Sequence, residues 1–216
     1  MISRYLEPQD AAAEILFGLI MALTFTLGAT LVTEAGADRF REIVLGTVTC
    51  NIAWGLIDGA LYVLSDMFEL GRKGVRIRQV KAARNRAEAM QRIRDEFHDE
   101  FASITSHEER QRLYAEIERL VLRMDAPAPR PTRESLAGAA IVFLLVSASS
   151  LPVLLPAVLI ADAATAVQIA NGLLIVGLFA TGYAMARAVE GRAIRVGLAM
   201  AAIGLVLVLI AKALGG

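Results

Sequence analysis

Apolar runs long enough to cross a lipid bilayer dominate this chain and limit the folds that it can adopt. An α-helix rises about 1.5 Å per residue, so about 20 apolar residues cross the roughly 30 Å hydrocarbon core of a bilayer. One long polar stretch, residues 72–125, lies between the second and the third of these runs. The sequence therefore predicts an all-α integral membrane protein with five transmembrane helices and a helical insert between the second and third. The predicted spans are residues 11–32, 43–64, 136–160, 163–186 and 196–214.

The predicted domain organisation follows the same division. Only Gly71 and Gly74 interrupt the start of the insert, so the second helix can continue beyond the membrane as one long helix. The proline-rich segment 127–131 ends the insert as a stiff linker. Pro152 and Pro156 should kink the far end of the third span. The three predicted parts are residues 1–66 with the first two spans, 67–131 with the insert, and 132–216 with the last three spans.

Composition narrows the class of protein further. The chain is 56% hydrophobic with a mean hydropathy of +0.55, and its zero net charge hides a concentration of charge in the insert. That segregation favours a membrane over nucleic acid as partner. Cys50 is the single cysteine, so neither an intramolecular disulfide nor a cysteine-based metal site is expected.

Recognisable enzyme motifs are absent from the sequence. It contains no phosphate-binding loop, dinucleotide fingerprint, HExxH motif or nucleophile elbow, so we expect neither an enzyme nor a permanent cofactor. The N-terminus carries no apolar core before a small-residue cleavage site, so the first span is expected to serve as the targeting signal.

Basic residues in the connections predict the orientation. Residues 72–94 carry nine Lys or Arg and one acid, whereas residues 161–165 carry no basic residue. By the positive-inside rule, the N-terminus and the insert are expected in the cytoplasm and the C-terminus on the opposite side. The abundance of Arg and Ala favours a bacterial protein, and hence the inner membrane. The basic stretch is either this topology signal alone or also a contact for anionic lipid.

The insert has the pattern of a helical hairpin. Ser106 and Glu109 form a capping-box pair that starts the second helix of the hairpin. The first predicted apolar stripe consists of Val80, Ala83, Ala87, Met90, Ile93, Phe97, Phe101 and Ile104. The second predicted stripe consists of Leu113, Ile117, Leu120 and Met124.

Two acidic residues within the predicted spans are candidates for an ion pathway. Glu14 lies in the first span and Asp58 in the second, where a charged side chain is costly unless it faces protein or water. Met21, two turns after Glu14, adds a soft thioether that distinguishes ferrous iron from magnesium. The alternatives are that Glu14 only reaches the membrane interface and that Met21 only fills apolar space.

Acidic and histidine residues in the insert suggest a second metal site. Carboxylates at i, i+4 repel each other unless a cation lies between them, and imidazole suits iron and manganese. The alternative is that Arg92 and Arg94 neutralise the acids. The candidate ligands are Glu88, Asp95, Glu96, His98, Asp99, Glu100, His107, Glu108 and Glu109.

Four segments carry a family resemblance. Residues 14–28 (EILFGLIMALTFTLG) open with Phe-Gly-Leu and continue with threonines, and residues 137–159 (AGAAIVFLLVSASSLPVLLPAVL) combine a small-residue start with paired prolines. Residues 173–187 (LLIVGLFATGYAMAR) and 197–215 complete the set. Together with the layout, these segments resemble the vacuolar iron transporter family.

The resemblance implies a homodimer that moves ferrous iron or manganese out of the cytosol, in exchange for protons. In the family an Asp-Gly pair follows the Phe-Gly-Leu segment on the ion path, whereas this chain has Ile20, Met21 and Ala22 there. Asp58 and Tyr62 are loose counterparts of a Gly-Glu-Tyr-like stretch in the family's second helix. The alternatives are a membrane scaffold or regulatory subunit that does not transport, and transport of a different solute.

Overall fold

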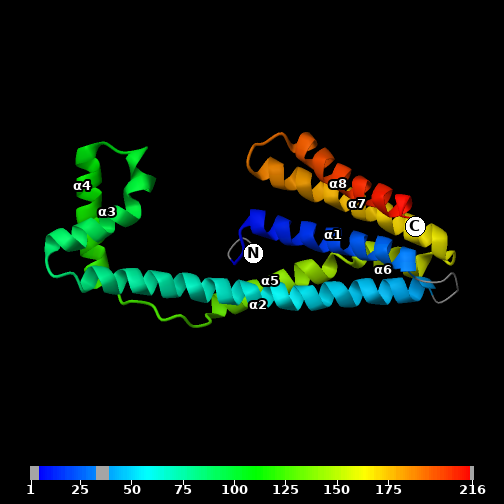
Figure 1. Ribbon diagram of the computed structural model, residues 1–216, viewed down its shortest axis with the longest axis horizontal. Helices are drawn as coiled ribbons and strands as arrows, with labels where there is room; N and C mark the ends of the chain where they lie inside the picture. The colour runs from blue at the N-terminus through cyan, green and yellow to red at the C-terminus, as the bar shows by residue number, and fades with distance from the viewer. Residues whose placement is uncertain (1–4, 33–38, 215–216) are drawn as a thin grey trace. The chain divides into compact units, whose positions relative to one another are not determined.

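The computed structural model describes residues 5–32 and 39–214, and within these ranges the secondary structure is entirely helical (Figure 1). The short link predicted between the first two helices falls partly on residues 33–38, which lie outside the described residues. The helices are α1 Pro8–Val32, α2 Arg39–Lys81, α3 Arg86–Ala102, α4 His107–Arg123, α5 Arg133–Ala148, α6 Leu151–Leu159, α7 Ala163–Ala188 and α8 Ala193–Ala213.

Four of the described helices, α1, α2, α7 and α8, are long and apolar enough to cross a membrane. The short helices α5 and α6 pass the same test as a pair, with a bend of 41° between them. Pro152 lies at the start of α6 and Pro156 inside it, and since proline has no backbone N–H, the helix cannot continue its hydrogen bonds there. The prediction of an all-α integral membrane protein is confirmed, with four candidate spans or five if the bent pair is one.

Helix α2 is much longer than a bilayer is thick. Its 43 residues correspond to about 65 Å at 1.5 Å per residue, about twice the hydrocarbon core. Gly71 and Gly74 do not interrupt it, and the expectation that the second helix continues into the insert is confirmed.

The chain divides into two compact units, and α2 contributes to both. Unit 1 contains Met1–Val63 and Arg133–Gly216, and unit 2 contains Leu64–Thr132.

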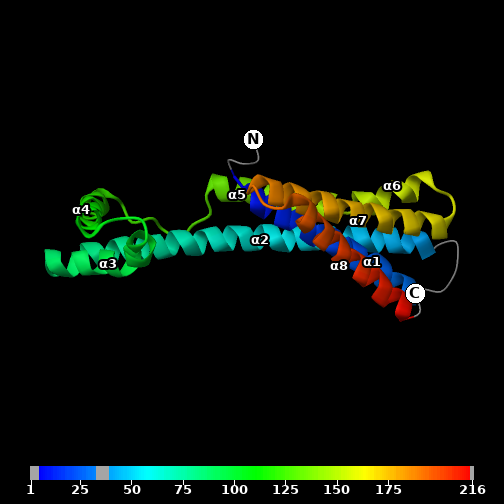
Figure 2. The ribbon, with the colours of Figure 1, turned by 90° about the horizontal axis from the view of Figure 1, so that it is seen from above.

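The core of unit 1 is formed mainly by α7, which packs against α8, α1 and α6 (Figures 1 and 2). Leu23, Leu174 and Leu178 are fully buried at its centre. A β-carbon at Gly204 of α8 would lie 2.9 Å from the Leu178 side chain, so the small residue permits the close approach of α8 to α7.

Unit 2 is organised around the hairpin of α3 and α4. Asn85 caps α3 by accepting a hydrogen bond from the Glu88 amide at 2.9 Å, so the chain starts a new helix after α2 ends at Lys81. The capping box of Ser106 and Glu109 is present at the start of α4, as predicted. The break between α2 and α3 divides the first predicted stripe between these two helices.

The predicted apolar face of the insert needs correction at several positions. Ala87 and Ile104 are exposed, as are Leu113 and Leu120 of α4 and Met124, which directly follows α4.

The buried face of α4 contains Tyr114, Ile117 and Val121, which pack against Ile93 and its neighbours. The Tyr114 ring also contacts Phe101, with centroids 6.4 Å apart. This face is rotated by one residue from the predicted one because a tyrosine ring buries more apolar area than a leucine side chain.

Candidate functional site

Two acidic side chains of unit 1, Glu14 on α1 and Asp58 on α2, lie close enough for their charges to interact. Both are half-buried, and Asp10, one turn before Glu14, adds a further negative charge to the same neighbourhood. Repulsion between carboxylates grows as water is excluded, and a bound cation or proton relieves it. Sequence reasoning selected these two acids for one ion pathway, and in the structure their charges interact.

The part of α2 just after Asp58 is held by two contacts. Tyr62 Oη donates a hydrogen bond to the Tyr5 carbonyl oxygen at 2.6 Å. Gly59 lies so close to α5 that a β-carbon there would be 3.0 Å from the Ala139 carbonyl oxygen. Glycine permits this approach between membrane helices, and the carboxylate of Asp58 is therefore carried by a firmly positioned backbone.

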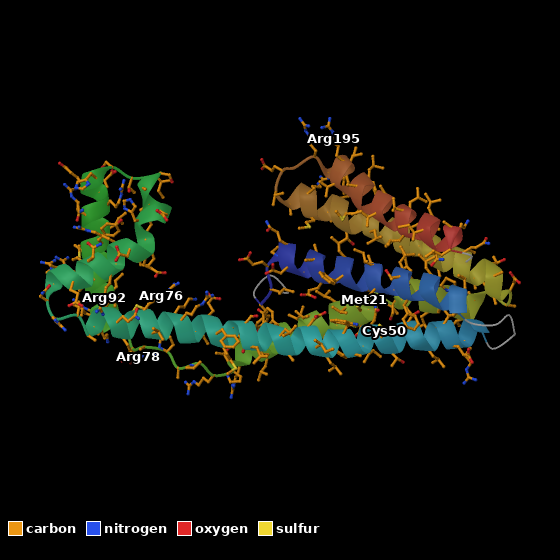
Figure 3. All side chains as sticks on the ribbon, viewed as in Figure 1. Met21, Cys50, Arg76, Arg78, Arg92 and Arg195 are labelled. Atoms are coloured by element: carbon orange, nitrogen blue, oxygen red, sulfur yellow. The ribbon has the colours of Figure 1, made fainter. Side chains whose placement is uncertain are left out.

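A groove of about 870 Å³ between α1 and α2 contains further donor atoms. Met21 of α1 and Cys50 of α2 both line it, and Figure 3 places these two labelled residues on neighbouring helices. Thr24 and Glu42 line the same groove. The groove therefore has a mostly apolar lining with sulfur and oxygen atoms at separate points along it. Glu42 and Cys50 are about 12 Å apart along α2, so they do not form a single coordination set.

Cys50 is a groove residue that sequence reasoning missed. The sequence shows that it cannot form an intramolecular disulfide, but no local pattern pairs it with Met21. Their common groove depends on the register of α1 against α2, which is set by packing. Met21 also contacts the apolar cluster around Val142 and Val146, so its side chain has a packing role as well.

Asn51 joins three helices in the interior of unit 1. Its fully buried side-chain amide donates hydrogen bonds to the carbonyl oxygens of Gly18 on α1 and Val146 on α5, each at 3.1 Å. Among the residues that the structure describes, neither its Oδ1 atom nor the Oγ atom of Ser147, both buried, has a hydrogen-bond partner. Asn51 therefore positions α1 against α2, next to the groove.

The candidate ligands of the insert do not gather into one cluster. Across residues 5–32 and 39–214, no group of three or more His, Cys, Asp or Glu side chains is placed to hold a metal ion. Among those candidates, the exposed residues are Asp95, Glu96, His98, Asp99, His107, Glu108 and Glu109 on α3 and α4; the side chain of Glu100 lies outside the described part.

Several of these acids have partners on the hairpin. Glu88 pairs with Arg92 at 2.6 Å, and Glu96 pairs with Arg76 of α2 at 2.7 Å. Asp95 accepts a hydrogen bond from Gln91 at 2.7 Å. Arg92 thus neutralises one acid, as the alternative interpretation of the sequence expected.

Glu109 is engaged in the cap of α4. The hydroxyl and the backbone N–H of Ser106 both donate hydrogen bonds to Glu109 Oε2, at 2.7 and 2.9 Å. These hydrogen bonds hold the pKa of the Glu109 carboxyl below its usual value, because they stabilise the ionised form.

A protein-family model matches well over half of the chain. The family model described as the VIT family matches residues 77–216, from the last turn of α2 to the C-terminus. No curated protein matches the chain. Glu14, Met21 and Asp58 lie outside the matched residues.

Proposed function

Since the chain belongs to the VIT family, the vacuolar iron transporter family of membrane metal-ion transporters, we propose that it moves ferrous iron or manganese out of the cytosol in exchange for protons. The observation that carries this proposal is that two half-buried acidic side chains, Glu14 and Asp58, lie on two helices that are long and apolar enough to cross a membrane. A divalent cation and protons can compete for such a pair, because either one relieves the repulsion between the carboxylates. That competition is the basis of exchange.

The proposed ion pathway continues from the carboxylate pair into the groove between α1 and α2. Met21 and Cys50 supply sulfur there, and Glu42 supplies oxygen in the first turn of α2. Magnesium binds thioethers and thiols poorly, whereas ferrous iron accepts mixed sulfur and oxygen donors. We therefore expect Glu14, Met21 and Asp58 to be pathway residues that select transition metals over magnesium.

The proposed topology has five spans, with α5 and α6 as one broken span. The N-terminus and the insert lie in the cytoplasm and the C-terminus on the opposite side of a bacterial inner membrane. The basic residues of α2 and α3, and those around Arg195 at the start of α8, support this orientation (Figure 3). A homodimer is the assembly that the family resemblance favours.

Uptake into proteoliposomes tests the pathway. The full-length protein is reconstituted, and entry of ferrous iron or manganese is followed with a metal-quenched dye inside the vesicles. Glu14→Gln and Asp58→Asn should each lose most of the uptake and the accompanying proton movement. Glu134→Gln is the matched control, because Glu134 is an exposed acid at the start of α5. Unchanged uptake in both pathway variants would refute the proposal.

The metal site in the insert is part of the proposal and has a separate test. Calorimetry with anaerobic ferrous iron or manganese on the Glu14→Gln, Asp58→Asn double variant reports binding outside the proposed pathway. Binding heat that disappears when His98 and His107 are both replaced by Ala supports ligands on α3 and α4. The absence of heat above buffer removes this site from the proposal.

A second candidate function rests on the first helix. Ile20, Met21 and Ala22 stand where the family's Asp-Gly pair is expected, and this difference favours a non-transporting scaffold or regulatory subunit. Folded protein that takes up no divalent ion above the level of empty liposomes would favour this candidate. Competition among metals for uptake distinguishes iron or manganese from a different transported solute.

A further inference from the structure

A groove of about 470 Å³ lies on α2 within unit 2, shortly after the second apolar run ends. Phe68 and Val75 give it apolar walls, and Arg72 and Arg78 line it as well. Phe68 is 71% exposed in the described structure, a costly arrangement for a phenylalanine in water. The combination of apolar and cationic walls indicates an amphiphilic ligand.

The second wall of the groove comes from the proline-rich segment that follows α4. A β-carbon at Gly71 would lie 3.4 Å from the Pro129 side chain, and one at Gly74 would collide with the Pro127 carbonyl oxygen. The two glycines therefore let this segment lie directly on α2. The result is a preformed groove, because Pro129 stands opposite the side chains of α2.

Two arginines of the groove have no bonded partner. Within the described residues, neither Arg72 nor Arg78 forms a hydrogen bond or salt bridge through its guanidinium group. Arg76, labelled with Arg78 in Figure 3, also lines the groove, but its guanidinium is paired with Glu96 of α3 at 2.7 Å.

The nearby acids leave these two positive charges available. Glu69 interacts electrostatically with Arg72, but its carboxylate is bonded to Lys73 at 2.9 Å. Asp66 is not among the residues that line the groove, and its Oδ2 atom is buried. The groove is therefore electrostatically complementary to an anion.

The distance along α2 places the near end of the groove at the level of lipid headgroups. The apolar run ends at Leu64, so Phe68 lies about 6 Å, Arg72 about 12 Å and Arg78 about 21 Å further along the helix. The headgroup layer is about 5–8 Å thick on each side of the hydrocarbon core. Side chains on a helix point toward its N-terminus, so the guanidinium of Arg72 extends back toward that layer.

We propose that this groove binds an anionic phospholipid, with Arg72 contacting the phosphate group, Phe68 and Pro129 contacting the glycerol and upper acyl chain, and Arg78 adding positive charge at the outer end of the groove. A guanidinium group donates paired hydrogen bonds to phosphate oxygens, which makes arginine well suited to a phosphodiester. Two uncompensated cations favour a lipid with net negative charge over a zwitterionic one.

Native mass spectrometry of the full-length protein in detergent, titrated with phosphatidylglycerol or phosphatidylcholine, tests the site. The protein should bind phosphatidylglycerol more tightly than phosphatidylcholine. A basic residue at the surface contributes about 1 kcal/mol, so Arg72→Gln and Arg78→Gln should each weaken phosphatidylglycerol binding about fivefold. Phe68→Ser should weaken binding of both lipids, because it removes the apolar wall.

Arg112→Gln is the matched control, since Arg112 is an exposed arginine of α4 that does not line the groove. It removes the same charge and should leave lipid binding unchanged. Arg72→Lys keeps the charge, should retain most of the affinity, and shows whether the position tolerates substitution. Equal losses in Arg112→Gln and the groove variants would overturn the proposal, as would equal affinity for the two lipids. Displacement of the lipid by millimolar inorganic phosphate would overturn it too, in favour of a soluble anion.

Discussion

Replacing Asn51 by Ala tests whether one buried amide holds α1, α2 and α5 together. The substitution removes two hydrogen bonds, to the carbonyl oxygens of Gly18 and Val146. The Val146 carbonyl keeps a bond from the backbone N–H of Ser149 at 3.2 Å, so the variant leaves it satisfied. The expected effect is therefore the loss of the two bonds themselves.

Measured side-chain hydrogen bonds between membrane helices contribute about 0.6 kcal/mol on average and at most about 1.7 kcal/mol. Two such bonds give a loss of about 1–3 kcal/mol in the free energy of unfolding. Within the described residues the buried Asn51 Oδ1 atom has no hydrogen-bond partner, so the substitution also removes the desolvation penalty of this atom. This gain offsets part of the lost stability. We therefore expect a value near the lower end, at about 1–2 kcal/mol.

Reversible unfolding of the full-length protein in mixed micelles, titrated with dodecyl sulfate, measures this value. Trp54 is the single tryptophan and lies on α2, so its fluorescence reports on the affected helix. Ser147→Ala is the control, because the Ser147 Oγ atom is also buried without a partner and forms no bond that could be lost. A loss in Asn51→Ala no larger than that in Ser147→Ala would show that the amide does not join the helices.

Three further variants address the packing of α1, the packing of the hairpin, and pH. Gly18→Ala should destabilise the protein by about 1–3 kcal/mol in the same titration, because the added β-carbon would overlap the Ser149 side chain. Gly28→Ala is the control, since a β-carbon there meets nothing within 4 Å. Equal losses in the two variants would contradict this packing. Tyr114→Ala should lower the free energy of unfolding by about 3–5 kcal/mol, seen as faster hydrogen exchange in α3 and α4. An equal loss in Leu113→Ala, at an exposed position, would contradict the assignment of the Tyr114 side of α4 as its buried face. Folding lowers the pKa of the Glu109 carboxyl, so the ionised side chain stabilises the start of α4 at pH values above the ordinary carboxyl pKa. This stabilisation is lost as the pH falls through the pKa of Glu109 in the folded protein. Glu109→Gln should remove this dependence of hydrogen exchange at the start of α4, and an unchanged pH profile would refute the role of the carboxylate.

Features that depend on neighbouring residues in the chain were predictable from sequence. The apolar runs are long enough for a bilayer, and they became the long helices α1, α2, α7 and α8 and the bent pair α5 and α6. The capping box of Ser106 and Glu109 involves residues three positions apart, so its geometry is local. The unbroken continuation of α2 past Gly71 was predictable for the same reason.

Tertiary packing decided which side chains meet. Sequence selected Glu14 and Asp58 together as pathway residues, but the interaction of their charges and the common groove of Cys50 and Met21 depend on how α1 lies against α2. The buried face of α4 was predicted one residue away from Tyr114, because several rotations of a helix satisfy the same apolar spacing. The rotation and register of a helix depend on contacts with distant parts of the chain, whereas its existence and length depend on the residues within it.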